Sequence, residues 1–179
     1  VALMFTKAMI IPTGDELAAG IVIDTDAPEI MKNLLAINGS AEVVRIAPVI
    51  DKEEAIVNKI KESAANGYDL IVLIGGSGGG HRFSKTLGKD FTHSALERYL
   101  DENASHEIYG KNGHMWSKLV CGKKGSTIII NVPGPYVEAQ AACEAFLSAY
   151  TKGLTLDEIS LEMANAVLAK YPVGAAKTV

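Results

Sequence analysis

Apolar and polar residues alternate along the chain in blocks that predict strands and helices in turn. Two stretches, Asp69 to Ile74 and Ser126 to Val132, are almost continuously apolar, which is typical of strands buried on both faces. Shorter apolar runs predict further strands at Lys7 to Pro12 and Ala41 to Ala47. Because helical patterns separate these strands, we expect an α/β fold with a mostly parallel sheet.

Apolar residues at helical spacing predict five helices between and after these strands. Asp26 is predicted to cap the first helix, and Asp51 with Glu54 has the spacing of a capping box at the second. Turn residues between Ser105 and Gly125 predict a hairpin or an inserted loop there. The predicted helices cover Pro28 to Asn38, Asp51 to Asn66, Thr92 to Asn103, Val137 to Tyr150 and Thr155 to about Lys170.

Composition narrows the class of protein. The 179 residues are 48% hydrophobic and 21% charged, which predicts one folded domain over 1–179, with its core at about 7–150 and a C-terminal helix and tail at 151–179. The net charge of -4 disfavours a nonspecific nucleic-acid binder. No apolar run is long enough to span a membrane and the start does not resemble a signal peptide, so we expect a cytoplasmic protein. A chain that begins at Val1 is expected to be excised from a longer one.

Three polar or glycine-rich loops follow predicted strands, and Asp51 follows a fourth. The carboxyl ends of parallel strands meet at one edge of a sheet, where α/β proteins bind ligands. We therefore expect these loops to form one ligand-binding edge. The candidate ligand-binding residues are Thr13, Gly14, Asp15, Glu16, Gly75, Gly76, Ser77, Gly78, Gly80, Arg82, Pro133 and Gly134.

The loop from Gly75 to Gly80 carries the clearest chemistry. Five glycines expose backbone N–H groups and permit positive φ, so successive N–H groups can converge on a phosphate or carboxylate, and Arg82 can contact phosphate. The loop matches neither a Walker motif nor a dinucleotide fingerprint. For the glycine loop, the alternative is a turn that binds no ligand. For Asp15, Glu16 and Asp51, the alternative is that the carboxylates only stabilise the starts of helices.

In its motifs the chain resembles the molybdopterin-binding domain family, which includes adenylyltransferases of the MoaB/Mog type, the large domain of molybdopterin molybdotransferases, and CinA-like proteins. The matching segments are Pro12 to Leu17, Gly20 to Asp26, Ile50-Asp51, Gly75 to Gly80 and Val132 to Pro135. The resemblance implies a three-layer α/β/α fold, a pterin ligand with a terminal phosphate bound along the loop edge, and a small homo-oligomer (a trimer or dimer). It also implies that Asp51 takes part in chemistry or in handling Mg²⁺.

One departure from the family pattern concerns catalysis. The family places an aspartate three residues beyond the last loop glycine, and this chain has Phe83 there. Loss of a carboxylate weakens Mg²⁺-dependent phosphoryl chemistry. Two functions follow as hypotheses. The first is an enzyme of molybdenum-cofactor synthesis that performs either molybdopterin adenylyl transfer with Mg²⁺ and ATP or metal insertion. The second is a noncatalytic module that binds a pterin or a nucleotide. A flavodoxin-like or CinA-like nucleotide domain is a third interpretation.

Overall fold

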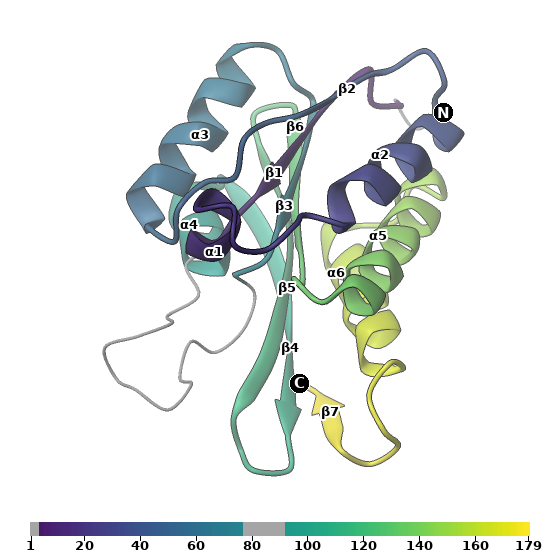
Figure 1. Cartoon of the computed structure of the whole chain (residues 1–179). Helices are drawn as coiled ribbons and strands as arrows, with labels where there is room; N and C mark the ends of the chain where they lie inside the picture. Colours follow the sequence, from purple (N-terminus) through teal and green to yellow (C-terminus); the bar gives the residue numbers. More distant parts are fainter. Residues whose placement is uncertain (1–3, 77–91) are drawn as a thin grey trace.

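The computed structural model describes residues 4–76 and 92–179, which form one sheet of seven strands flanked by helices (Figure 1). The spatial order of the strands is β2-β1-β3-β6-β5-β4-β7. The strands are β1 (Lys7–Pro12), β2 (Glu42–Arg45), β3 (Leu70–Ile74), β4 (Glu102–Gly110), β5 (Met115–Lys124), β6 (Thr127–Val132) and β7 (Ala176–Thr178).

The sheet has a parallel half and an antiparallel half that meet at β6. Strands β2, β1, β3 and β6 pair in parallel, and β6, β5, β4 and β7 pair in antiparallel fashion. The central strand β3 is buried along its whole length, as its unbroken apolar sequence predicts. The carboxyl ends of β1, β3 and β6 therefore lie side by side at one edge.

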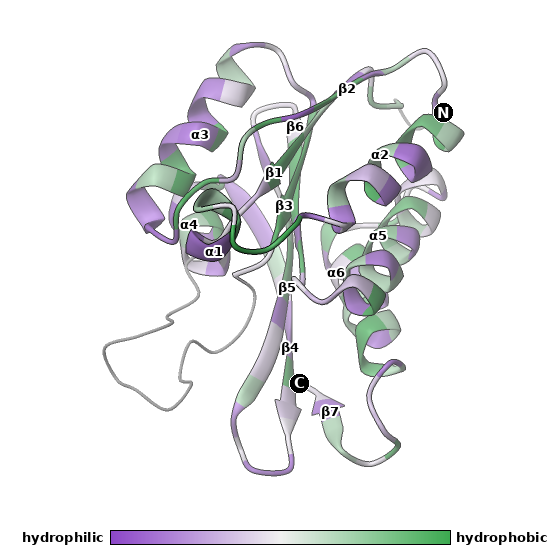
Figure 2. Ribbon diagram, viewed as in Figure 1, coloured by the Kyte–Doolittle hydropathy of each residue, from purple (hydrophilic) through white to green (hydrophobic). Residues whose placement is uncertain are grey.

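Helices cover both faces of the sheet, which confirms the three-layer α/β/α fold (Figure 1). On one face, α2, α5 and α6 pack against Val72 and Ile130; on the other, α3 and α4 pack against Ile71 and Ile129. Figure 2 shows the central strands β1 and β3 as apolar, between helices that carry both apolar and polar residues. The helices are α1 (Asp15–Ala18), α2 (Asp26–Ile37), α3 (Glu53–Ala65), α4 (Thr92–Tyr99), α5 (Tyr136–Thr151) and α6 (Leu156–Leu168).

The local pattern predicts most elements but not all of their ends. The segment after Ser105 is a hairpin of β4 and β5, and Thr155 with Glu158 forms the expected capping box of α6. The helix predicted from Thr92 to Asn103 is too long, because it ends at Tyr99 and β4 begins at Glu102. Within residues 4–76 and 92–179, no helix has the length and apolar character of a membrane span.

Candidate functional site

Thr13 anchors the loop after β1 to the neighbouring strand. Its side chain is buried, and both its hydroxyl and its backbone N–H donate hydrogen bonds to the carbonyl of Ile74, at 2.7 and 2.9 Å. The next residue, Gly14, has a φ of 139° and donates its N–H to Val49. The glycine thus turns the chain away from the sheet and leaves Asp15 and Glu16 exposed at the edge.

Asp15 and Asp51 hold each other at this edge. A carboxylate oxygen of Asp51 accepts the backbone N–H of Asp15 at 3.2 Å, and a carboxylate oxygen of Asp15 accepts the N–H of Asp51 at 3.0 Å. The prediction that Asp51 is the cap of a helix is wrong, because Lys52 is the N-cap residue of α3, and its side chain makes no capping hydrogen bond. The carboxylate of Asp51 turns instead to a backbone donor from a different strand end.

The start of the glycine loop packs tightly beside Thr13. Gly75 and Gly76 both have positive φ, 87° and 65°, which side-chain-bearing residues rarely adopt. A Cβ at Gly76 would collide with the hydroxyl of Thr92 and approach its Cβ to 3.0 Å. Glycine is therefore required here by both conformation and space. The other predicted loop residues, Ser77, Gly78, Gly80 and Arg82, lie outside the described residues, as does Phe83.

The turn after β6 completes the edge. Pro133 is buried and Gly134 is exposed, and a Cβ on Gly134 would lie 3.8 Å from the Cα of Gly75. Gly75 in turn donates its N–H to Val132 at 2.9 Å. The structure thus brings together Thr13 to Glu16, Asp51, Gly75, Gly76, Pro133 and Gly134, which the sequence predicts as one edge.

The described residues also line cavities outside this edge. One of about 640 Å³ lies at the amino end of the strands, near Phe5, Asp69 and Tyr150. Another, of about 600 Å³, separates α5 from α6 and is lined by Tyr136 and Lys170 among others. Paired carboxylates and positive-φ glycines gather at the carboxyl edge instead, so that edge remains the candidate site.

Asp24, and not the predicted Asp26, accepts the first backbone N–H groups of α2. Asp26 is not a cap: Thr25 is the N-cap residue of α2, and Asp24 accepts the N–H groups of Asp26 and Ala27, both at 3.1 Å. Asp24 also pairs with Arg45 at 2.9 Å. The side chain of Asp26 is buried, and its Oδ1 has no hydrogen-bond partner among the described residues. Burial, with a smaller contribution from the charge of Asp24, raises its pKa to about 6.

Removing the charge of Asp26 is expected to stabilise the protein at neutral pH. The pKa of Asp26 is higher in the folded state than in the unfolded chain, so its contribution to stability is greatest below about pH 4 and is lost as pH rises through about 6. Asp26→Asn should raise the free energy of unfolding by about 1–2 kcal/mol at pH 7.5 and leave it nearly unchanged at pH 4.

Urea denaturation of both proteins at the two pH values measures this difference. Glu29→Gln removes another carboxylate from the first turn of the same helix and controls for the helix dipole. An equal effect of Asp26→Asn at both pH values would contradict the assignment.

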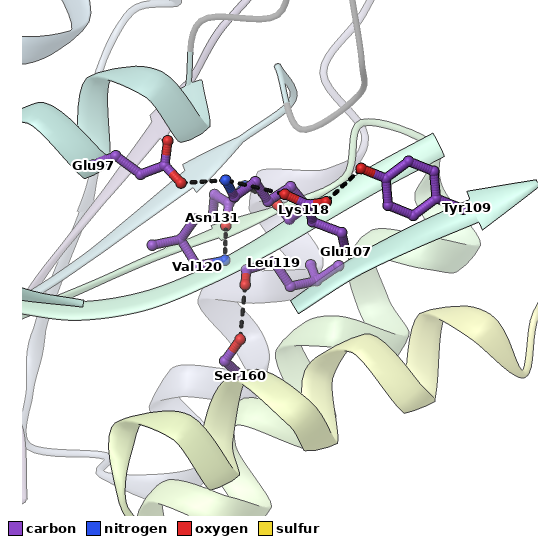
Figure 3. Close-up of polar contacts among 8 residues, drawn as sticks. All are labelled: Glu97, Glu107, Tyr109, Lys118, Leu119, Val120, Asn131 and Ser160. Carbon is purple, nitrogen blue, oxygen red and sulfur yellow. Dashed lines mark hydrogen bonds and ion pairs between the residues drawn. The ribbon is translucent and has the colours of Figure 1, made fainter. Parts of the chain in front are cut away.

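A polar cluster that the sequence does not predict lies beside the end of β6 (Figure 3). Lys118 on β5 forms ion pairs with Glu97 of α4 and with Glu107 of β4, the latter at 3.3 Å. Tyr109 donates its hydroxyl to the other oxygen of Glu107 at 2.6 Å. The cluster is assembled from three elements, so no local spacing indicates it.

Asn131 joins this cluster to the candidate edge. Its side chain is fully buried; the carbonyl oxygen accepts the N–H of Val120 at 2.6 Å, and the amide donates to the carbonyl of Lys118 at 2.8 Å (Figure 3). Regular β5–β6 pairing ends where Cys121 lies opposite Ile130. The Asn131 side chain therefore holds the two strands together at the point where they diverge. A polar residue within the apolar run of β6 is the sequence signal that marks it.

Comparison with known proteins places this chain in a family. The family model for a probable molybdopterin binding domain matches residues 9–153, most of the chain, and the chain belongs to this family. A CinA-like protein of Thermosipho melanesiensis is 34% identical over 166 residues, covering 79% of this chain and 41% of that protein. The chain thus spans about two fifths of the length of this curated relative.

Solved structures agree on the fold. The molybdopterin biosynthesis enzyme MoaB of Thermus thermophilus superposes with a TM-score of 0.64 at 25% identity and covers 89% of this chain and 97% of its own. The CinA protein of Thermoplasma acidophilum has a TM-score of 0.63 at 19% identity and covers 81% and 98% of the two chains. At the latter identity, the likeness shows the fold alone.

Proposed function

We propose that the carboxyl edge of the sheet binds a molybdopterin-like ligand, a pterin with a terminal phosphate, in the synthesis or handling of the molybdenum cofactor. The observation that carries this proposal is the convergence of Thr13 to Glu16, Asp51, Gly75-Gly76 and Pro133-Gly134 in a chain of the molybdopterin-binding family. In this assignment the glycine loop, including Ser77, Gly78, Gly80 and Arg82, binds the phosphate through backbone N–H groups and the guanidinium.

Asp15 and Asp51 are suited to a magnesium ion. Mg²⁺ prefers oxygen ligands and is usually held by one or two carboxylates together with waters and substrate phosphates. The described residues contain no group of three or more acidic, histidine or cysteine side chains around one point, so the ligand's phosphates would have to complete such a site. When bound, the ion would neutralise phosphate charge, while Asp15 and Asp51 would fix its position beside the loop.

A noncatalytic binding module is the second candidate, and one observation favours it. Phe83 stands where the family pattern has an aspartate, and a phenyl ring provides no metal ligand. Adenylyl transfer with ATP, metal insertion and a homo-oligomeric assembly remain proposals for this chain. Mass spectrometry of pterins released from the purified protein tests the binding proposal shared by both candidates. A protein that neither retains a pterin nor binds an added one would overturn it.

Asp51→Asn separates catalysis from binding. Asparagine keeps an oxygen that can accept the N–H of Asp15, so the free energy of unfolding should change by less than about 1 kcal/mol. Loss of the carboxylate charge should lower magnesium-dependent adenylyl transfer by about 100-fold, a value typical for one lost stabilising group.

The activity is measured as pyrophosphate release with molybdopterin, ATP and Mg²⁺. Asp157→Asn on the exposed first turn of α6 is the matched control. Unchanged turnover in Asp51→Asn would exclude Asp51 from the chemistry. Pterin binding by a wild-type protein that shows no turnover would support the noncatalytic module.

A further inference from the structure

Lys118 lies close to the candidate edge but outside the set of residues that the sequence indicates. Asn131 ties the backbone of Lys118 to β6 two residues before Pro133, and Gly134 beyond it approaches Gly75. On the other side, α4 starts at Thr92, which contacts Gly76, and carries Glu97 to the Lys118 ammonium. Helix α4 therefore links the position of Gly76 to the Lys118–Glu97 pair.

Among the described residues, the Lys118–Glu97 pair leaves one N–H of Lys118 and one oxygen of Glu97 without a partner. The ammonium of Lys118 has three N–H groups, and the described residues use two of them, for Glu97 and Glu107. Both oxygens of Glu107 are engaged, one by Lys118 and one by Tyr109. Glu97 gives one oxygen to Lys118, and the other points away from it without a partner among the described residues (Figure 3).

The charge of the cluster is unsuited to a phosphate. Two carboxylates and one ammonium give a net charge of about -1 at neutral pH. Hydrogen bonding by Tyr109 lowers the pKa of Glu107. Burial opposes the charge of Lys118, but the hydrogen bonds and charges of Glu97 and Glu107 outweigh burial and raise the pKa of Lys118. An anion is therefore better placed at the glycine loop. The cluster fits a neutral group that presents an acceptor next to a donor.

We propose that Lys118 and Glu97 recognise the 2-amino-4-oxopyrimidine edge of the ligand. Lys118 donates to the 4-oxo oxygen, and the free oxygen of Glu97 accepts from the adjacent ring N–H and the 2-amino group. Pterins and guanine share this edge. The inference rests on the proposed function, and it orients the ligand with its ring at β5 and α4 and its phosphate at the glycine loop.

Changing one ligand atom and one side chain together tests this recognition. The probes are 6-methylpterin and 6-methyllumazine, which carries an oxo group in place of the 2-amino group and so faces the Glu97 carboxylate with a second acceptor. Wild-type protein should bind 6-methylpterin about 10- to 100-fold more tightly than 6-methyllumazine, which is the range for a hydrogen bond to a charged group. Glu97→Gln supplies an amide N–H for that oxo group and should reduce this preference at least tenfold.

Fluorescence titration measures both affinities, and Glu162→Gln on the exposed side of α6 should leave them unchanged. Lys118→Met should weaken binding of both probes, because both have a 4-oxo group. An unchanged preference in Glu97→Gln, with pterin binding intact, overturns the inference and leaves the proposed function standing. A wild-type protein that binds neither probe nor GMP overturns both. Tighter binding of GMP than of neopterin monophosphate, with AMP excluded, supports the edge recognition and assigns the site to guanine.

Discussion

Valine at position 76 is expected to abolish binding of a phosphorylated pterin. Gly76 has a φ of 65°, and any side chain there collides with Thr92 at the start of α4. The loop must therefore move away from the edge, which removes the backbone N–H groups from the phosphate. We expect Gly76→Val to weaken binding of neopterin monophosphate by more than about 100-fold, equal to more than about 2.8 kcal/mol.

A valine at a second positive-φ glycine distinguishes the loss of binding caused by the collision from any loss caused by backbone strain. Gly153, in the turn between α5 and α6, has a φ of 71°, and a Cβ there would meet no atom within 4 Å, so Gly153→Val imposes similar strain without a collision. It should cost about 1–3 kcal/mol of stability and leave binding unchanged. Fluorescence titration and urea denaturation of both variants give the two quantities. Equal affinities in Gly76→Val and wild type would remove the glycine loop from the binding site.

The edge is predictable from sequence because it depends on strand ends. Each of β1, β3 and β6 has an apolar sequence that stops at a proline or glycine, and parallel pairing brings those stops together. Thr13, Gly75 and Pro133 follow from this rule alone. A local pattern is enough wherever the partner of a residue is set by the topology of the sheet.

Individual side-chain partners are less predictable, because tertiary donors compete with local ones. Asp51 has the spacing of a capping box, yet its carboxylate accepts the N–H of Asp15, and the N-cap residue of α3 is Lys52, whose side chain makes no capping hydrogen bond. Asp24 and Asp26 are both suited to capping, and only the backbone path decides that Asp24 does it. Strand β7 has three residues and exists through its pairing with β4, which no alternation within Ala176–Thr178 reveals.

Asn131 contributes both to the fold and to the proposed recognition of the ligand. Of the substitutions proposed for this protein, its replacement by alanine should lower the free energy of unfolding most. Alanine there leaves the N–H of Val120 and the carbonyl of Lys118 without their partner in a buried place. An unsatisfied buried group costs about 1–3 kcal/mol, so we expect Asn131→Ala to lower the free energy of unfolding by about 2–4 kcal/mol. Urea denaturation measures this loss.

Ser160→Ala provides the comparison, because the Ser160 hydroxyl on α6 donates to the carbonyl of Leu119 on β5 at 2.8 Å and also hydrogen-bonds Nδ1 of His106 at 3.0 Å. Loss of these two contacts should cost about 1 kcal/mol, because His106 is only partly buried and water can replace the serine there. Since Asn131 also fixes the backbone of Lys118, Asn131→Ala should reduce the preference for 6-methylpterin over 6-methyllumazine, whereas Ser160→Ala should retain it. If the two variants lose equal stability and keep equal preference, Asn131 does not hold β5 against β6, and Lys118 owes its position to Glu97 and Glu107 alone.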